Sequence, residues 1–106
     1  MSGVVTVQLV NCMYGRPASG VRTWLHRMNV AEPADSEVTD DSGRCNLRLA
    51  DARPQLVYQL VLDIDSYFAS LGIEPSCPKI TVAFRADVTA NILLILAPAG
   101  YMAYVG

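Results

Sequence analysis

One continuous apolar run near the end of this 106-residue chain constrains its fold more than any other stretch. Residues 92–96 (ILLIL) are too few for a membrane helix, which needs about 20 residues, and they predict a strand buried on both faces. Residues 97–100 (APAG) permit a tight reversal, and residues 101–105 predict a second strand. Tyr101 and Tyr104 cannot share a face of that strand, because side chains alternate along it. Another sheet or another subunit must therefore cover this hairpin.

The rest of the chain repeats the strand signal at near-regular spacing. Residues 65–71, followed by Gly72, are the exception and predict one short helix with an Asp or Ser cap. Eight short strands and one helix predict an all-β sandwich, a single domain over residues 1–106. The other alternating or β-branched segments are 4–10, 21–28, 37–39, 44–49, 56–64 and 79–85, with loops at 14–20, 29–36 and 51–54.

A turn at residues 40–43 (DDSG) separates two of these strands. Gly43 stands where a positive φ is needed, so we expect strands 37–39 and 44–49 to pair as a small hairpin. Arg44 lies just past this turn. It is either a guanidinium that binds a ligand or a solvated residue paired with Asp40 or Asp41.

The charge balance excludes two classes of partner. Eight basic residues against ten acidic ones give a formal charge of -2, and no Lys/Arg cluster is present to bind phosphates or anionic lipid. We therefore expect neither nucleic acid nor membrane as a partner. A hydrophobic content of 52% favours an oligomer. Met1-Ser2-Gly3 runs directly into a strand pattern without a leader, so we expect a cytoplasmic protein.

The chain has three cysteines and one histidine. Cys12, Cys45 and Cys77 are widely spaced, which fits neither a disulfide framework nor a metal knuckle, so we expect buried free thiols. His26 is the single histidine, and we expect it at the surface or on an edge strand. The sequence therefore predicts no metal site, no cofactor and no Ser-His-Asp arrangement.

Four stretches, in order along the chain, carry a family resemblance. They are GRPASGV at 15–21, DDSGR at 40–44, DIDSYFASLGIEP at 63–75 and GYMAYVG at 100–106. Together they resemble transthyretin and its enzymatic relative, 5-hydroxyisourate hydrolase. The resemblance implies a sandwich of two four-stranded sheets with one short helix. It also implies dimers made by edge-strand pairing, and a homotetramer that binds a small molecule in a channel between the dimers.

The resemblance also implies site residues. The enzyme's pattern has a His in the first strand, an Arg after the turn, a second His before the buried strand and a final Tyr-Arg-Gly-Ser. On this chain the first His falls on Gln8, the Arg on Arg44, the second His on Asn91 and the final motif on Tyr104-Val105-Gly106. We expect Arg44, Gln8 and Asn91 as catalytic residues, and as ligand-binding residues Leu93, Tyr101, Met102 and Tyr104.

The missing imidazoles decide the functional expectation. Imidazole is the natural group to activate water near neutral pH, and the amides of Gln8 and Asn91 do not titrate. We therefore expect a repurposed enzyme that cyclises, isomerises or rearranges a small, fairly apolar metabolite of a biosynthetic pathway, by positioning and hydrogen bonding. The alternatives are a binding protein without turnover, a residual 5-hydroxyisourate hydrolase, and a structural tetramer with no open channel.

Overall fold

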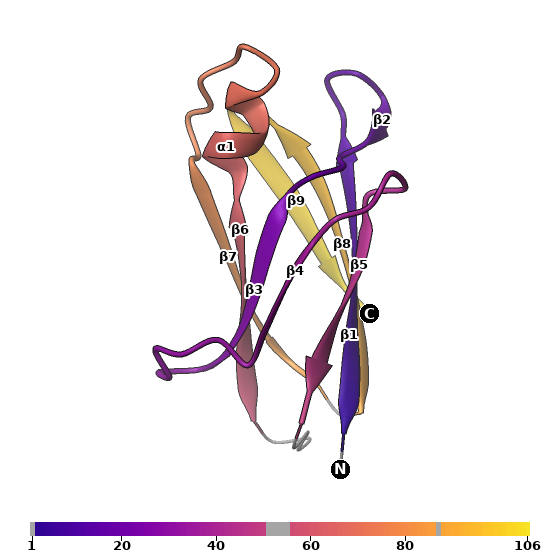
Figure 1. The fold of residues 1–106 in the computed structure, drawn as a ribbon, viewed down its shortest axis with the longest axis vertical. Coiled ribbons are helices and arrows are strands. Elements are labelled where there is room, and N and C mark those ends of the chain that lie inside the picture. The colour runs from indigo at the N-terminus through magenta and orange to yellow at the C-terminus, as the bar shows by residue number, and fades with distance from the viewer. Residues whose placement is uncertain (1, 51–55, 87) are drawn as a thin grey trace.

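The computed structural model of the protein describes residues 2–50, 56–86 and 88–106 as a two-layer β-sandwich (Figure 1). The expected loop at 51–54 lies outside the described residues. The elements of the described part, in chain order, are β1 (Gly3–Asn11), β2 (Arg16–Pro17), β3 (Arg22–Arg27), β4 (Asp35–Val38), β5 (Arg44–Leu49), β6 (Val57–Asp63), α1 (Ile64–Ala69), β7 (Lys79–Arg85), β8 (Thr89–Ala97) and β9 (Gly100–Val105).

Strand β1 organises the first sheet. It runs parallel to β8 along residues 4–11, while β5 pairs with residues 3–8 and β2 with residues 10–11. The hairpin partner β9 completes this five-stranded sheet, and the second sheet has the order β4-β3-β6-β7. The all-β sandwich with one short helix is therefore confirmed. The first sheet has a fifth strand because two residues of the expected 14–20 loop pair with β1 as β2.

The expected hairpin around the 40–43 turn is wrong. Strand β4 pairs with β3 in one sheet and β5 pairs with β1 in the other, so the turn carries the chain between the two layers. The turn itself forms: Gly43 N donates to Asp40 O at 2.9 Å, and Asp40 N donates to Arg44 O at 2.9 Å. The local turn signal is real, but the two strands pair with different neighbours in different sheets.

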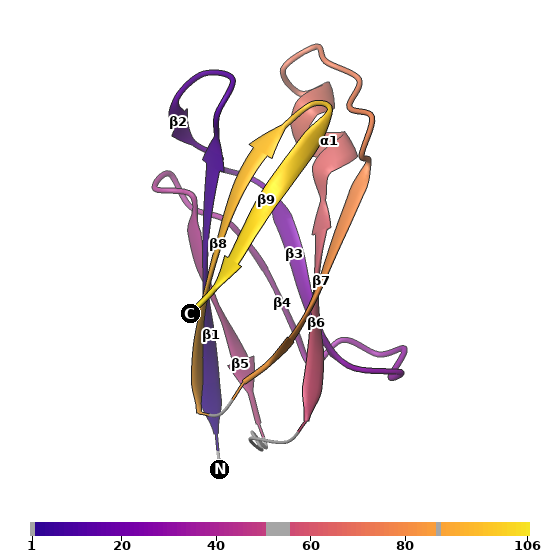
Figure 2. The ribbon, with the colours of Figure 1, turned by 180° about the vertical axis from the view of Figure 1, so that it is seen from behind.

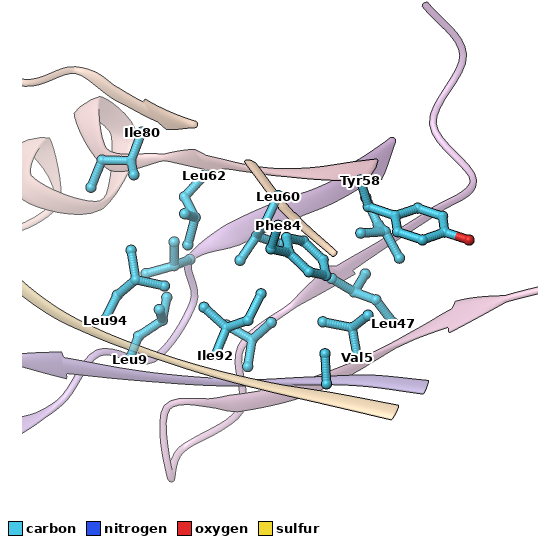
Figure 3. Packing of buried hydrophobic residues seen from close by; sticks show 14 of the residues in the cluster. Val5, Leu9, Leu47, Tyr58, Leu60, Leu62, Ile80, Phe84, Ile92 and Leu94 are labelled. Atoms are coloured by element: carbon cyan, nitrogen blue, oxygen red, sulfur yellow. The ribbon is translucent and has the colours of Figure 1, made fainter. Parts of the chain in front are cut away.

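The core lies between the two sheets. Figure 3 shows side chains of β1, β5 and β8 pointing toward side chains of β6 and β7. These positions alternate along each strand, as burying one face of a sheet requires. The labelled members, all buried, are Val5, Leu9, Leu47, Tyr58, Leu60, Leu62, Ile80, Phe84, Ile92 and Leu94.

Burial of the 92–96 run on both faces is wrong for the single chain. Ile92, Leu94 and Leu96 are buried in the core, but Leu93 is 36% exposed on the other face of β8. The second sheet packs on the core side of β8, and no element of the described residues covers its outer face at Leu93.

Helix α1 closes one end of the sandwich (Figure 2). Asp63 is its N-cap and accepts a hydrogen bond from Ser66 N at 3.1 Å, as expected of a cap. The helix begins one residue before the expected 65–71 and ends at Ala69. Beyond it, Ser76 N donates to Pro98 O at 2.7 Å, which ties the segment after the helix to the β8–β9 turn.

The three cysteines are free thiols, as expected, but they are not all buried: Cys12 is exposed, and Cys45 and Cys77 are half-buried. Burial raises the pKa of the Cys45 thiol; the contact with Thr23 at 3.5 Å opposes this rise, and Glu37, Asp40 and Asp35 add to it. The thiol form is therefore favoured in the folded state.

This shift predicts alkaline destabilisation. Below the thiol pKa of the unfolded chain, about 8.5, the contribution of Cys45 to stability is complete, and it is lost as the pH rises through the higher pKa of the folded state. Urea unfolding between about pH 7 and 10, under reducing conditions, should show a smaller alkaline loss of stability for Cys45→Ala than for the unaltered protein. Cys12→Ala, at an exposed thiol, is the control. Equal alkaline losses in all three proteins would contradict the prediction.

Candidate functional site

Four side chains form a row across the outer face of the five-stranded sheet. Arg44 of β5 lies opposite Gln8 of β1, Gln8 opposite Leu93 of β8, and Leu93 opposite Tyr104 of β9. The neighbours of these residues on β1, β5 and β8 point into the core, so alternation sends the row outward. Strand register therefore brings together residues that are far apart in the sequence.

A hollow of about 500 Å³ opens along this row. That volume lies within the usual range for small-molecule sites. Side chains and backbone from β1, β5, β8 and β9 surround it. The lining residues are Thr6, Gln8, Arg44, Asn91, Ile92, Leu93, Tyr104, Val105 and Gly106.

The guanidinium of Arg44 is held at one nitrogen. Its Nε donates a hydrogen bond to Oε1 of Gln8. Asp40 does not pair with this cation: its Oδ1 accepts from the backbone N–H groups of Ser42, at 2.9 Å, and Arg44, at 3.0 Å. Within the described part of the chain, the two Nη groups have no hydrogen-bond or ion-pair partner. They remain available to a ligand in the hollow.

Asn91 occupies the next row of the same face. It lies opposite Thr6 of β1, whose Oγ1 donates to Asn46 Oδ1 at 3.0 Å. On the other side, the backbones of Asn91 and Gly106 exchange two hydrogen bonds of 2.8 Å. The Asn91 side chain is exposed at the hollow and adds a neutral donor and acceptor beside the Arg44 cation.

The predicted ligand-binding residues lie on β8 and on both faces of β9. Leu93 and Tyr104 line the hollow, whereas Met102 lies one row further, opposite Ile95, and outside the lining. Tyr101 lies opposite the buried Leu96 and therefore points away from the hollow. The roles proposed for these side chains stay predictions.

Sequence reasoning missed several lining residues. Thr6 shares the outward face of β1 with Gln8, so the period-two alternation could have identified it. Ile92 is buried in the core, and Val105 follows Tyr104 at the edge. The family's final motif falls on Tyr104-Val105-Gly106 and could have identified Val105, whereas no pattern in the sequence predicts that the core residue Ile92 also borders a cavity.

The single histidine lies away from this site. His26 is on β3 of the other sheet, next to the buried Leu25, and therefore faces outward from the sandwich. It borders a separate hollow of about 440 Å³, and its Nδ1 lies 3.3 Å from Val30 O. Within one chain it cannot activate water at Arg44.

No group of three or more His, Cys, Asp or Glu side chains in residues 2–50, 56–86 and 88–106 is arranged to hold a metal ion. In the same residues no helix has the length and apolar character needed to cross a membrane.

The chain belongs to the HIUase/Transthyretin family, whose model matches residues 5–106. It is 32% identical over 120 residues to the 5-hydroxyisourate hydrolase of Halalkalibacterium halodurans, covering 100% of this chain and 99% of the relative. It is 29% identical over 111 residues to a Schizosaccharomyces pombe protein named "Probable 5-hydroxyisourate hydrolase", covering 96% and 90%. The solved Klebsiella pneumoniae 5-hydroxyisourate hydrolase matches with a TM-score of 0.85 and 25% identity, over 98% of this chain and 99% of that one.

These relatives correct the functional expectation. A repurposed enzyme of non-hydrolytic chemistry was expected because both imidazoles of the family pattern are replaced. The family is enzymatic, and the similar proteins, matched over nearly the whole chain, are named for hydrolysis. Loss of one kind of base does not by itself imply loss of the reaction, because Arg44, which can stabilise negative charge, is retained.

Proposed function

We propose that this protein is a hydrolase that opens the ring of 5-hydroxyisourate. The observation that carries the proposal is Arg44, whose two Nη groups have no partner within the described residues at a hollow of about 500 Å³. The relatives named 5-hydroxyisourate hydrolase, at 29% and 32% identity, support the same substrate.

The residues at the hollow suit an electrostatic mechanism. When water adds to a carbonyl carbon of an oxidised purine ring, negative charge develops on the carbonyl oxygen. The Arg44 guanidinium stays protonated in proteins and can donate two parallel hydrogen bonds to that oxygen or its neighbour. The C–N bond then breaks, and the ring nitrogen takes up a proton.

Asn91 and Tyr104 complete the proposed site. The Asn91 amide offers a donor and an acceptor that can orient the polar edge of the ring, and the Tyr104 hydroxyl can donate toward the leaving nitrogen. Within the described part of the lining no imidazole or carboxylate side chain is present to activate water. The acceleration is therefore assigned to positioning and charge stabilisation.

We further propose a homotetramer built from two dimers. Leu93, Met102 and Tyr104 expose 36%, 55% and 50% of their surface on the outer face of the sheet, and a second copy laid on this face would cover them and close the hollow. Light scattering at micromolar concentration should give four times the chain mass of 11.5 kDa. A stable monomer would contradict this assembly.

The proposed function is tested by the initial rate of 5-hydroxyisourate ring opening, followed by ultraviolet absorbance and corrected for the spontaneous reaction. The rate should rise in proportion to protein concentration. Asn91→Ala should lower kcat/KM by about tenfold, as the loss of one orienting hydrogen bond does. Rates equal to the spontaneous reaction at every protein concentration would overturn the proposal.

A further inference from the structure

The carboxamide of Gln8 is bound at both ends. Its Oε1 accepts from Arg44 Nε, and its Nε2 donates to the backbone oxygen of Ser42 at 2.8 Å. Arginine nitrogens only donate and carbonyl oxygens only accept, so these two partners fix which end of the amide is oxygen. To make both contacts, the side chain at position 8 must therefore present an acceptor to Arg44 Nε and a donor to Ser42 O.

The two contacts tie the Arg44 side chain to its own turn. Ser42 precedes Arg44 by two residues, and Asp40 Oδ1 holds the backbone N–H groups of both. The amide of Gln8 thus bridges the turn backbone and the guanidinium. A guanidinium on an exposed, flexible side chain would otherwise sample many rotamers. Because the hydrogen bond to Gln8 fixes Nε, the two Nη groups of the planar guanidinium keep a constant direction relative to the hollow.

We infer that Gln8 is a positioning residue that aims the Arg44 guanidinium into the hollow and keeps that aim independent of pH. The inference rests on the proposed function for its kinetic consequences, and on the hydrogen bonds alone for its structural ones. Gln8 acts through Arg44 and is not itself a catalytic residue. In this inference Gln8 has a positioning role, in place of the catalytic role expected from the family resemblance.

The pH independence follows from the chemistry of the amide. A neutral imidazole at this position could accept from Arg44 Nε and donate to Ser42 O, but a protonated imidazole has two donors and no acceptor. It would also repel the guanidinium. A carboxamide keeps both functions at every pH.

Within the described residues, no histidine lies on the turn or on the strands around Gln8. The ionisable side chains of the turn and strands around Gln8 are Asp40 and Asp41 on the turn, Arg44 and Arg48 on the outer face of β5, and Tyr104 on β9. Cys45 is on β5 but points to the opposite face, opposite Val7. None of these is an imidazole.

The structural test measures hydrogen exchange at the Arg44 Nε–H by NMR of ¹⁵N-labelled protein, with the resonance assigned by its loss in Arg44→Lys. Exchange should be slow in the unaltered protein and at least about tenfold faster in Gln8→Met, which keeps the length of the side chain without the amide. Asn46→Ala is the matched control, because it removes the adjacent cross-strand hydrogen bond on the same two strands. Equal exchange in Gln8→Met and the unaltered protein would overturn the inference.

The kinetic test compares kcat and KM across about pH 5 to 8. The unaltered protein should show no imidazole inflection, and Gln8→Met should lose roughly tenfold in kcat with little change in KM. Gln8→His should approach the unaltered rate near pH 8 and lose it as the introduced imidazole is protonated, below about pH 6.5. A flat profile for Gln8→His, or an imidazole inflection in the unaltered protein, would overturn the inference.

The two tests separate the inference from the proposed function. If the unaltered protein does not accelerate ring opening, the proposed function fails, while the exchange measurement still decides whether Gln8 holds Arg44. If ring opening is accelerated but Gln8→Met changes neither kcat nor Nε–H exchange, only the inference fails.

Discussion

Arg44→Ala should lower kcat/KM for 5-hydroxyisourate hydrolysis by about 10²- to 10³-fold, the usual cost of removing one donor to a developing oxyanion. Arg44 is the only side chain with a permanent positive charge in the described lining of the hollow, and its Nη groups have no partner within the described residues. The substitution removes the positive charge that, in the proposed mechanism, stabilises the negative charge of the transition state. The loss should therefore appear mainly in kcat, measured by the ring-opening assay at saturating and limiting substrate.

Two further variants separate geometry from charge. Arg44→Lys keeps the charge but lacks the planar fork, and it should recover only part of the activity. Arg48→Ala removes an equal charge from the same outward face of β5, opposite Val4 and outside the hollow, and it should leave the rate within about twofold of the unaltered protein. Similar losses in Arg44→Ala and Arg48→Ala would show that net charge, rather than a placed guanidinium, governs the reaction.

Gly43→Ala should destabilise the fold by about 3 kcal/mol or more, because conformational strain and steric overlap act together. Gly43 has φ +74°, and a Cβ added there would lie 2.3 Å from the backbone oxygen of Leu9 and 3.1 Å from Ala18 N. Those atoms cannot move independently, since Ala18 N donates to Leu9 O and Leu9 N donates to Gly43 O. The turn that carries Arg44 is thus packed directly on β1.

The measurement for Gly43 is equilibrium urea unfolding at a fixed protein concentration, followed by the fluorescence of Trp24, the single tryptophan. Gly72→Ala is the matched control: its φ is +75°, but no atom lies within 4 Å of an added Cβ. It should cost only the conformational strain, about 1 kcal/mol. Equal losses in the two variants would show that the backbone around Gly43 relaxes freely.

Local patterns predicted most of the secondary structure. Strand β7 has the predicted ends, Lys79 and Arg85, because its alternation is regular and Pro78 precedes it. Asp63 and Gly72 mark the helical segment through capping and positive φ, which are properties of single residues. These signals depend only on neighbours in the sequence.

Pairing between distant strands could not be read in the same way. The turn signal at 40–43 does not determine whether the two flanking strands pair with each other or join different sheets. That depends on which distant strand each of them pairs with. The row of Arg44, Gln8, Leu93 and Tyr104 likewise depends on the register of four strands. Family resemblance indicated Gln8, Arg44 and Asn91, but not the hydrogen bond that joins the first two.

The reaction was mispredicted for a different reason. Replacement of two imidazoles by Gln8 and Asn91 shows which base is missing, but not what the retained guanidinium can still accelerate. In the structure, Gln8 fills the first-strand position and makes both contacts that a neutral imidazole could make with Arg44 and Ser42. A substitution that removes titration can therefore preserve the hydrogen-bond pattern.

The most direct test of the central claim is a progress curve with 5-hydroxyisourate in large excess over the protein, run in water enriched in ¹⁸O. The protein is predicted to convert many equivalents of substrate, faster than buffer alone, with oxygen from water in the ring-opened product. A curve that superimposes on the spontaneous reaction would contradict the claim that Arg44 serves hydrolysis in this fold.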